Sequence, residues 1–242
     1  MKAVLITGAS GGIGKALVNT FRESGYYVIG SDLAPSNVVA DIFLTCDLSE
    51  LATDEGAGER FAAALGEALA GRTLAALVNN AATQILGKTA DIGLASFRRS
   101  LDINVVAPFR LAQLSLRFLE QNGCVLNIGS VHAAATKPGF VSYATSKAAL
   151  HGLTRALAID LGKRCRAICL APAATATDML VAGFHEDPEG LAQLGAFHPL
   201  DRVASPAEIA RLAVLLVNEA HFCTGTTLYA DGGILSRLHD PD

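Results

Sequence analysis

The sequence is poor in charged residues and has no cluster of one sign. Only 17% of its 242 residues are charged, the formal net charge is −4, and lysines and arginines do not form a block. Nucleic acids and anionic membranes are bound mainly through concentrated positive charge. We therefore expect neither of them as a partner.

Long apolar runs and a leader segment are also lacking. No apolar run reaches the length that a membrane-spanning helix needs. Residues 1–6 already show the pattern of a strand, which leaves no room for a signal peptide. These two absences predict a cytoplasmic protein.

Cysteine pairs with metal-ligand spacing are missing as well. The five cysteines are scattered, and none forms a Cys-x-x-Cys motif. Their odd number and their spacing predict reduced thiols and no metal site. Cys165 and Cys169 lie in an apolar strand pattern, where filling of the core is the expected role.

What the sequence does contain is a regular alternation of strand and helix patterns, and 51% of its residues are apolar. Apolar strands that are each followed by a helix are typical of a parallel sheet with helices on both faces. Because no repeat or linker interrupts the pattern, we predict a single doubly wound α/β domain of Rossmann type over residues 1–242, with a seven-stranded parallel sheet. The predicted strands are 3–7, 26–31, 42–45, 74–79, 124–129, 166–171 and 226–230, and the predicted helices are 12–24, 56–70, 93–120, 142–161 and 206–218.

One connection between predicted strands is unusually short. Between Asp32 and Ile42 lie nine residues, including Pro35, whereas a connection that contains a helix normally needs more. We predict one short turn there at most. Such a turn would leave the neighbouring face of the sheet thinly covered.

A glycine-rich segment follows the first predicted strand. Gly8, Gly12 and Gly14 lie between that strand and the first predicted helix. Glycines in this position let the backbone turn tightly and approach a pyrophosphate at the helix N-terminus. The alternative is a merely flexible turn, but the flanking strand and helix favour a dinucleotide site.

Asp32 stands at the end of the second predicted strand, eighteen residues after Gly14. A carboxylate there can accept hydrogen bonds from a ribose 2′-hydroxyl and repels a 2′-phosphate. No lysine or arginine follows it directly, and none lies in the glycine-rich segment. The pattern favours NAD over NADP, and an aspartate that only caps a turn is the alternative.

Tyr143 and Lys147 are four residues apart on the predicted helix 142–161, so an ammonium group lies beside a phenol. A free phenol loses its proton near pH 10, and a nearby positive charge lowers that pKa. The pair could therefore take and return a proton at neutral pH. The spacing alone is a weak signal, but Ser130 follows the fifth predicted strand thirteen residues earlier.

Together these features resemble the short-chain dehydrogenase/reductase family, in its roughly 250-residue branch, over nearly the whole chain. Further segments match: 79–82 resembles the family's Asn-Asn-Ala-Gly motif, 172–177 its Pro-Gly-x-x-x-Thr stretch, and 231–233 its C-terminal Asp-Gly-Gly signature. The resemblance implies a nicotinamide cofactor, NAD, bound by Gly8, Ser10, Gly12, Ile13, Gly14, Asp32, Asp47, Leu48, Asn80, Ala81, Tyr143, Lys147, Pro172, Thr175 and Thr177.

The same resemblance implies a catalytic set of Ser130, Tyr143, Lys147 and Asn104. Tyr143 would exchange a proton with the substrate hydroxyl, and Ser130 would hold the substrate oxygen. Lys147 would lower the pKa of Tyr143 and bind the nicotinamide ribose. Asn104 would fix a water that relays protons from Lys147 to solvent. A purely structural role is the alternative for each: a capped turn, a solvated lysine, or an amide that satisfies helix backbone groups.

Two positions depart from the family pattern. Ala82 and Ala173 stand where the family usually has glycine. If either position requires a positive φ, alanine costs roughly 1 kcal/mol and its methyl group crowds the cofactor. We expect slightly altered geometry on the nicotinamide side, with function retained.

The substrate pocket is expected to be walled by Gln84, His132 and a lid near residues 178–200. Ser130, His132 and the placement of Gln84 resemble 3-hydroxybutyrate dehydrogenases, and Ser-Val-His also occurs in the family's glucose dehydrogenases. His132 could bind a carboxylate or a sugar hydroxyl, or it could only stack on the pocket wall. We expect a small polar alcohol. The lid would supply Met179, Leu180, Phe184, His185, Phe197 and His198.

Three functions compete at this point. The first is an NAD-dependent oxidoreductase that acts on the secondary alcohol of a small sugar, polyol or hydroxy acid, or on the corresponding ketone. The second is a ketoreductase of a biosynthetic or acyl-carrier intermediate, which predicts NADPH and a basic patch. The third is a non-catalytic dinucleotide sensor, which would not need both Tyr143 and Lys147.

The predicted helices 93–120 and 142–161 carry apolar residues on more than one side. The resemblance implies that they pair with a second copy, giving a homodimer or homotetramer. The alternative is that both faces are buried within one subunit. The residues concerned are Phe109, Leu114, Leu116, Leu150, Leu153 and Leu157.

Overall fold

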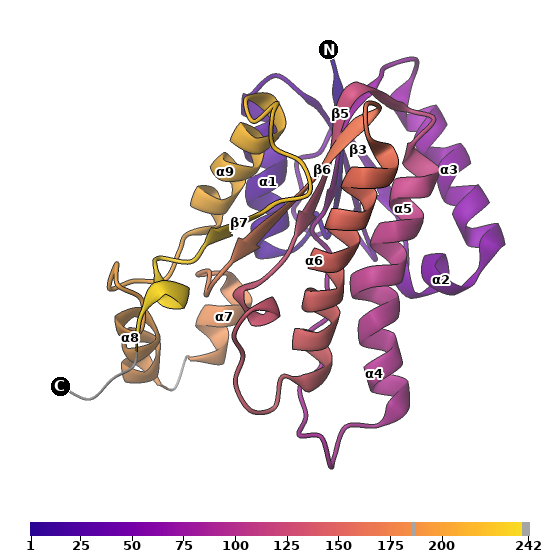
Figure 1. The fold of residues 1–242 in the computed structure, drawn as a ribbon. Coiled ribbons are helices and arrows are strands. Elements are labelled where there is room, and N and C mark those ends of the chain that lie inside the picture. The colour runs from indigo at the N-terminus through magenta and orange to yellow at the C-terminus, as the bar shows by residue number, and fades with distance from the viewer. Residues whose placement is uncertain (185–186, 239–242) are drawn as a thin grey trace.

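Seven parallel strands form one sheet through the centre of the molecule (Figure 1). The computed structural model describes residues 1–184 and 187–238. The strand order is β3-β2-β1-β4-β5-β6-β7, so the chain reverses its direction of travel between β1 and β4. The predicted fold class is confirmed. The strands are β1 (Ala3–Thr7), β2 (Tyr27–Asp32), β3 (Ile42–Thr45), β4 (Leu74–Asn79), β5 (Leu119–Ile128), β6 (Cys165–Pro172) and β7 (Thr227–Ala230).

Helices cover both faces of this sheet, with α1 and α9 on one side and α3, α5 and α6 on the other (Figure 1). The α-helices are α1 (Gly12–Glu23), α2 (Leu48–Thr53), α3 (Glu55–Leu69), α4 (Leu94–Leu101), α5 (Ala107–Ser115), α6 (Val141–Leu161), α7 (Asp178–Gly183), α8 (Pro188–Ala196) and α9 (Pro206–Asn218). Shorter turns are the π-helical η1 (Asp102–Val106) and the 3₁₀ turns η2 (Val131–Ala133) and η3 (Ile234–Ser236).

The two cores follow from the alternation of side chains along each strand. Leu5 of β1 points into the core beneath α3, α5 and α6, whereas its neighbours Val4 and Ile6 point into the core beneath α1 and α9. All three side chains are fully buried. Cys165 and Cys169 are also buried, and all five cysteines are free, as predicted.

The short connection between β2 and β3 contains no helix, as predicted. Leu33 and Val39 in this connection are 63% and 60% exposed, and no residue of β3 is fully buried. The edge of the sheet at β3 is therefore thinly covered.

The prediction of one helix over 93–120 is wrong at both its middle and its end. The π-helical turn η1 separates α4 from α5, and α5 ends at Ser115. Strand β5 then begins at Leu119, where it pairs with Leu74 of β4, rather than at 124. The apolar residues near 116–119 fit a helix or a strand, and pairing with the buried strand β4 decides the outcome.

The carboxyl ends of the strands bring distant segments to one edge of the sheet. Residues 8–11 follow β1, 80–93 follow β4, 129–140 follow β5 and 173–177 follow β6. Ligands of doubly wound folds bind at this edge, next to the point where the strand order reverses. Within the described part of the chain, the structure contains no helix that is long and apolar enough to cross a membrane.

Candidate active site

The glycine-rich segment forms a cradle that has no room for side chains at Gly8, Gly12 and Gly14. Gly8 has φ +64°, and a side chain at Gly14 would overlap the carbonyl oxygen of Gly8. A Cβ atom at Gly12 would lie 2.7 Å from Cβ of Thr177. Helix α1 begins at Gly12, and no side chain caps its first turn. Its backbone N–H groups are thus free to meet an anion, so the loop fits the pyrophosphate of a dinucleotide.

Two further segments pack against this cradle. The side-chain amide of Asn80 donates to the carbonyl oxygens of Thr7 and Gly8, at 3.0 and 3.1 Å. The Thr7 hydroxyl accepts from the backbone N–H groups of Asn80 and Ala81. Residues expected from the sequence to bind one ligand therefore lie together. The segment that follows Pro172 comes within contact distance of Gly12 through Thr177, while Thr175 is buried at 8% exposure.

Asp32 points its carboxylate back towards the cradle. One oxygen accepts from the backbone N–H of Ser10 at 3.1 Å and the other from that of Leu33 at 2.8 Å. No ion pair among the described residues includes Asp32. The carboxylate keeps lone pairs with which it can accept ribose hydroxyl groups.

Asp47 performs a structural task at the neighbouring strand end. Its carboxylate caps α2 by accepting from the backbone N–H and the hydroxyl of Ser49, at 2.8 and 2.7 Å. These bonds lower the pKa of Asp47. Leu48 is buried beside it. The expected contact of Asp47 and Leu48 with NAD stays a prediction.

Ser130, Tyr143 and Lys147 come together where β5 ends and α6 begins. The ammonium nitrogen of Lys147 lies 5.7 Å from the centre of the Tyr143 ring and donates to the carbonyl oxygen of Ile128 at 2.8 Å. Ser130 and Lys147 are 6% and 3% exposed. This is the arrangement that the spacing predicts, at the edge of the sheet where the cradle lies.

Burial dominates the electrostatics of this group. Burial raises the pKa of Tyr143, and the Ser130 hydroxyl only partly opposes that change. Burial also lowers the pKa of Lys147, to about 8. In the protein alone, desolvation therefore sets the direction of the Tyr143 shift, and the expectation that Lys147 lowers the pKa of Tyr143 stays a prediction.

Asn104 lies in η1 and is 1% exposed. Its carbonyl oxygen accepts from the backbone N–H of Thr83, and its amide group donates to the Thr83 carbonyl and to the Ser146 hydroxyl, each at 2.8–2.9 Å. Ser146 in turn donates to the Tyr143 carbonyl at 2.7 Å. Because both amide hydrogens are used, the side chain fastens residue 83 to α6, and the water relay stays a prediction.

His132 stacks on the ring of Phe140. Its ring lies 4.4 Å from that of Phe140 at an angle of 8°, and its Nδ1 atom is 3.0 Å from the Thr136 hydroxyl. Burial and the nearby Lys137 lower the pKa of His132. Sequence reasoning missed both Phe140 and Thr136. The only signal for Phe140 was its place just before the predicted helix that carries Tyr143, because it is the N-cap residue of α6.

The remaining expectations have mixed outcomes. Gln84 is exposed on the segment after β4. Neither Ala82 nor Ala173 has a positive φ, so the two departures from glycine carry no backbone strain. Of the expected lid, α7 and α8 are described, whereas His185 lies outside the described residues.

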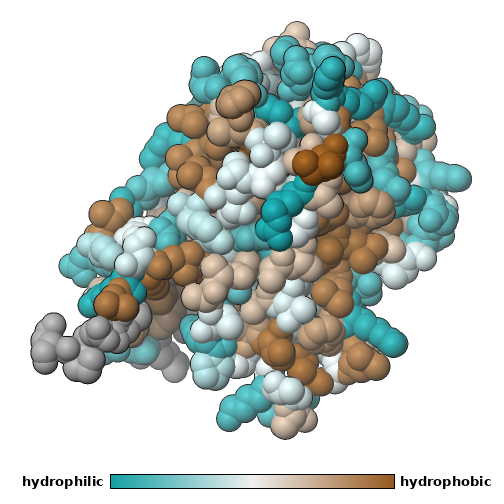
Figure 2. Space-filling model, viewed as in Figure 1, coloured by the Kyte–Doolittle hydropathy of each residue, from teal (hydrophilic) through white to brown (hydrophobic). Residues whose placement is uncertain are grey.

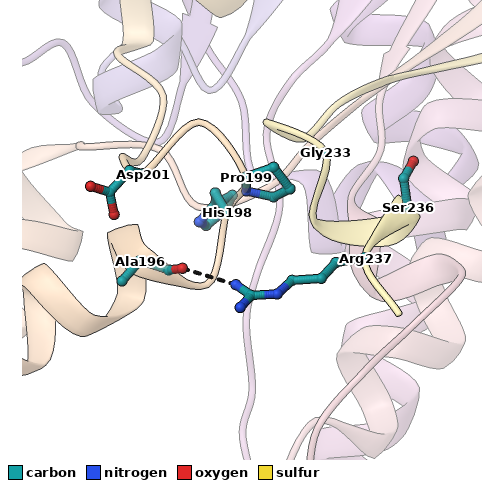
Figure 3. A pocket seen from close by; sticks show the side chains of 7 residues that line it. All are labelled: Ala196, His198, Pro199, Asp201, Gly233, Ser236 and Arg237. Carbon is teal, nitrogen blue, oxygen red and sulfur yellow. Dashed lines mark hydrogen bonds between the residues drawn. The ribbon is translucent and has the colours of Figure 1, made fainter. Parts of the chain in front are cut away.

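His198 does not offer a polar tip to a substrate. It is 3% exposed, its Nδ1 faces the Leu194 carbonyl at 2.9 Å, and its ring packs on Gly232. His198 is one of the residues that line a cavity of about 520 Å³ between α8 and η3. Arg237 also lines this cavity and donates to the Ala196 carbonyl at 3.1 Å (Figure 3). This bond fastens the C-terminal turn to α8.

His151, one turn beyond Lys147 on α6, is expected to make folding sensitive to acid. Burial and the positive charges of Lys147 and Arg155 lower its pKa to about 4. In the unfolded chain, His151 binds a proton near pH 6.5. The contribution of the neutral side chain to the free energy of unfolding is therefore complete above pH 6.5 and is lost as the pH falls towards 4. When urea unfolding is measured between pH 7 and 5, the free energy of unfolding should change less steeply with pH in His151→Gln than in the wild type. The exposed His221→Gln is the control, and an unchanged slope in His151→Gln would contradict the assignment.

Comparisons with known proteins agree with this geometry. A family model described as Enoyl-(Acyl carrier protein) reductase matches residues 8–235. The 2,5-dichloro-2,5-cyclohexadiene-1,4-diol dehydrogenase of Sphingobium indicum is 34% identical over 252 residues, with 96% of each chain covered. Among solved structures, the ligand-free aldohexose dehydrogenase of Thermoplasma acidophilum has a TM-score of 0.91 and 27% identity, covering 100% of this chain and 96% of that one. A 4-hydroxyisoleucine dehydrogenase complexed with NADH has a TM-score of 0.87 and 25% identity, covering 98% and 100%.

Proposed function

The chain belongs to the short-chain dehydrogenase/reductase family, and on that premise we propose that it is an NAD-dependent dehydrogenase of a small polar secondary alcohol. It is an oxidoreductase with a nicotinamide cofactor. One observation supports the proposed cofactor and substrate class. Ser130, Tyr143 and Lys147 lie together beside the glycine-rich segment, and the Asp32 carboxylate accepts a hydrogen bond from Ser10 of that segment. That arrangement joins a proton-transfer group to a dinucleotide site.

In the proposed reaction, NAD held by the glycine-rich segment and Asp32 would supply the hydride acceptor. The side chains of the protein would move the proton and position the alcohol. The Ser130 hydroxyl holds the substrate oxygen. Tyr143, once deprotonated, accepts the proton of the substrate hydroxyl, and in the reverse direction it returns that proton to the ketone oxygen. Lys147, whose pKa is lowered to about 8, can gain or lose a proton near neutral pH.

The proposed substrate class is a small sugar, polyol or hydroxy acid. Support comes from the relatives, whose names specify a cyclic diol, an aldohexose and a hydroxy amino acid. His132 supplies a polar ring beside Ser130, whose hydroxyl accepts from the backbone N–H of His132 at 3.2 Å. Gln84 follows β4 on the same edge of the sheet.

The preference for NAD is tested at Asp32. In Asp32→Asn the side chain keeps its shape and loses its charge, so a 2′-phosphate is no longer repelled. We expect the ratio of kcat/KM with NADP to kcat/KM with NAD to rise about tenfold or more, which corresponds to roughly 1.4 kcal/mol. The measurement is NAD(P)H absorbance over a panel of alcohols with both cofactors in parallel.

Asp160→Asn, an exposed change on α6, serves as the control for the loss of one negative charge. A wild-type enzyme that works only with NADP would overturn the proposed cofactor. So would an Asp32→Asn variant whose ratio matches that of the control.

A second candidate function is a ketoreductase of a carrier-bound intermediate, and the name of the matched family model supports only the carrier-bound part of it, because that name specifies an enoyl group. It predicts reduction with NADPH and a basic docking patch. Carrier-bound ketones in the same panel separate it from the first. A chain that binds NADH and turns over neither class would be a dinucleotide sensor.

We also propose that two or four copies assemble. Figure 2 shows apolar residues gathered on the side where α4, α5 and α6 lie. Phe109 on α5 and Ile159 on α6 are 41% and 83% exposed, whereas Leu150 and Leu157 are buried within the subunit. Exposed apolar residues on neighbouring helices support a contact between copies.

A further inference from the structure

Three aromatic rings meet at the candidate proton-transfer residue. The rings of His132 and Phe140 are stacked, and the ring of Tyr143 meets both edge-on, with centres 5.8 Å from His132 and 6.2 Å from Phe140. The angles are 73° and 75°. Edge-to-face pairs at these distances are favourable contacts of the ring quadrupoles. Tyr143 is thus held on one side by two rings, while Lys147 lies over it at 5.7 Å.

Phe140 is fixed in place by its backbone. The N–H of Gly87 donates to the Gly139 carbonyl at 2.8 Å, and Gly87 forms a bridge with Phe140. The Ser142 hydroxyl donates to the Ile85 carbonyl, also at 2.8 Å. These bonds tie the start of α6 to the segment after β4. The position of the Phe140 ring is therefore set by two parts of the chain.

Phe140 has little surface left with which to contact a substrate. It is 9% exposed. His132 stacks on its ring at 4.4 Å, and the ammonium nitrogen of Lys137 lies 5.0 Å from its centre. Any influence of this ring on the reaction must pass through His132 and Tyr143.

We propose that Phe140 is a positioning residue, which shields the phenol of Tyr143 from water and fixes the direction in which its hydroxyl faces the substrate. The second part rests on the proposed function, and the first does not. The Phe140 ring occupies one side of the Tyr143 ring at 6.2 Å, and the smaller side chain of leucine would leave space there that water can enter. Water in that gap would stabilise the phenolate.

Any test must distinguish the effect of Phe140 on Tyr143 from the effects of the polar groups that face Tyr143. Lys147 faces it from α6, Ser130 from the end of β5 and His132 from η2, and Lys137 acts from beyond Phe140. Burial raises the pKa of Tyr143. Since Phe140→Leu leaves all four polar neighbours in the sequence, a change in the titration of Tyr143 reports the loss of the ring.

The test uses the composition of the chain, which has four tyrosines and no tryptophan. Tyrosinate absorbance is titrated in the wild type and in Phe140→Leu, each paired with the same protein carrying Tyr143→Phe, so that the difference isolates Tyr143. We expect the midpoint in Phe140→Leu to fall by about 0.5–1 pH unit. Far-ultraviolet circular dichroism confirms that the proteins stay folded.

Two further variants serve as a control and as a substitute for Phe140→Leu. Phe61→Leu makes the same change at a residue that is 6% exposed in the core beneath α3 and α5, and it should leave the midpoint unmoved. Phe140→Met, which fills more of the gap, replaces Phe140→Leu if the latter does not fold, and it should show a smaller shift in the same direction.

A kinetic arm measures the second part of the proposal. Phe140→Leu should lower kcat/KM about tenfold with the Kd of NADH within about twofold of the wild type, and it should move the pH profile as the titration moves. An unchanged midpoint, or an equal shift in Phe61→Leu, overturns the proposal. If the wild type oxidises no alcohol and reduces no ketone, the proposed function fails, and the titration alone still decides whether Phe140 shields Tyr143.

Discussion

Replacing Tyr143 with phenylalanine is expected to lower kcat by about 10²–10⁴-fold, because the variant has no group that can exchange a proton with the substrate hydroxyl. The ring itself remains, so its edge-on contacts with His132 and Phe140 are kept. Lys147 keeps its bond to the Ile128 carbonyl at 2.8 Å. We therefore expect the fold and the binding of NADH to survive the change.

The measurement combines turnover with binding. Initial rates are followed by NADH absorbance, and the Kd is obtained from the fluorescence of bound NADH, for which a chain without tryptophan gives a low background. Tyr27→Phe on β2 is the matched control and should turn over at the wild-type rate. Full turnover by Tyr143→Phe would remove this residue from the mechanism.

The pH dependence of the wild type bears on the same group. Burial raises the pKa of Tyr143, so the phenol is protonated at neutral pH in the protein alone. A protonated phenol can donate to a ketone at once, whereas oxidation of an alcohol first requires loss of that proton. The rate of alcohol oxidation should therefore increase as the pH rises. Lys147, with a pKa of about 8, lies beside Tyr143 and loses its own proton over part of the same pH range.

Most of the fold could be predicted because the signals are local. Each buried strand is a short apolar run, and the next helix carries its own period, so the order of elements follows from the sequence. Asp32 and Tyr143 could be placed because strand ends and helix starts share one edge of the sheet. The short connection after Asp32 was predictable from its length alone.

The parts that could not be predicted depend on contacts between distant segments. Strand β5 begins as early as Leu119 because Leu74 of β4 offers that residue a pairing partner. The pKa of Tyr143 rose because α6 lies against the end of β5, and a spacing of four residues says nothing about burial. The stacking of Phe140 on His132 likewise requires the bridge between Phe140 and Gly87.

Arg166 is another residue whose structural role could not be predicted from the sequence. It lies in the apolar strand β6 and is 8% exposed. Its guanidinium group donates to the carbonyl oxygens of Leu216, Val217 and Ala220 at 2.7–2.9 Å. Leu216 and Val217 lie in the last turn of α9, and Ala220 follows the helix. Helix ends leave carbonyl acceptors without partners and carry partial negative charge. No ion pair among the described residues includes Arg166, so the helix end is what balances its charge.

Replacing Arg166 with methionine is expected to lower the free energy of unfolding by about 3–5 kcal/mol, the cost of leaving buried partners of a charged group without it. For a domain of this size the melting temperature should fall by roughly 10 °C. Arg166→Lys should recover only part of the loss, because one ammonium group cannot reach three carbonyls in the geometry of a guanidinium fork. Urea and thermal unfolding followed by circular dichroism provide the measurement.

Arg211→Met, an exposed change on α9 itself, is the control and should stay within about 0.5 kcal/mol of the wild type. Arg166 lies at the start of β6, at the end of the sheet opposite the cradle and Tyr143. Well below its melting temperature, the Arg166→Met protein should therefore bind NADH as the wild type does. An unfolding free energy within 1 kcal/mol of the wild type would show that water or a rearranged helix end replaces the guanidinium group, and the buried arginine would then contribute little to holding α9 against the sheet.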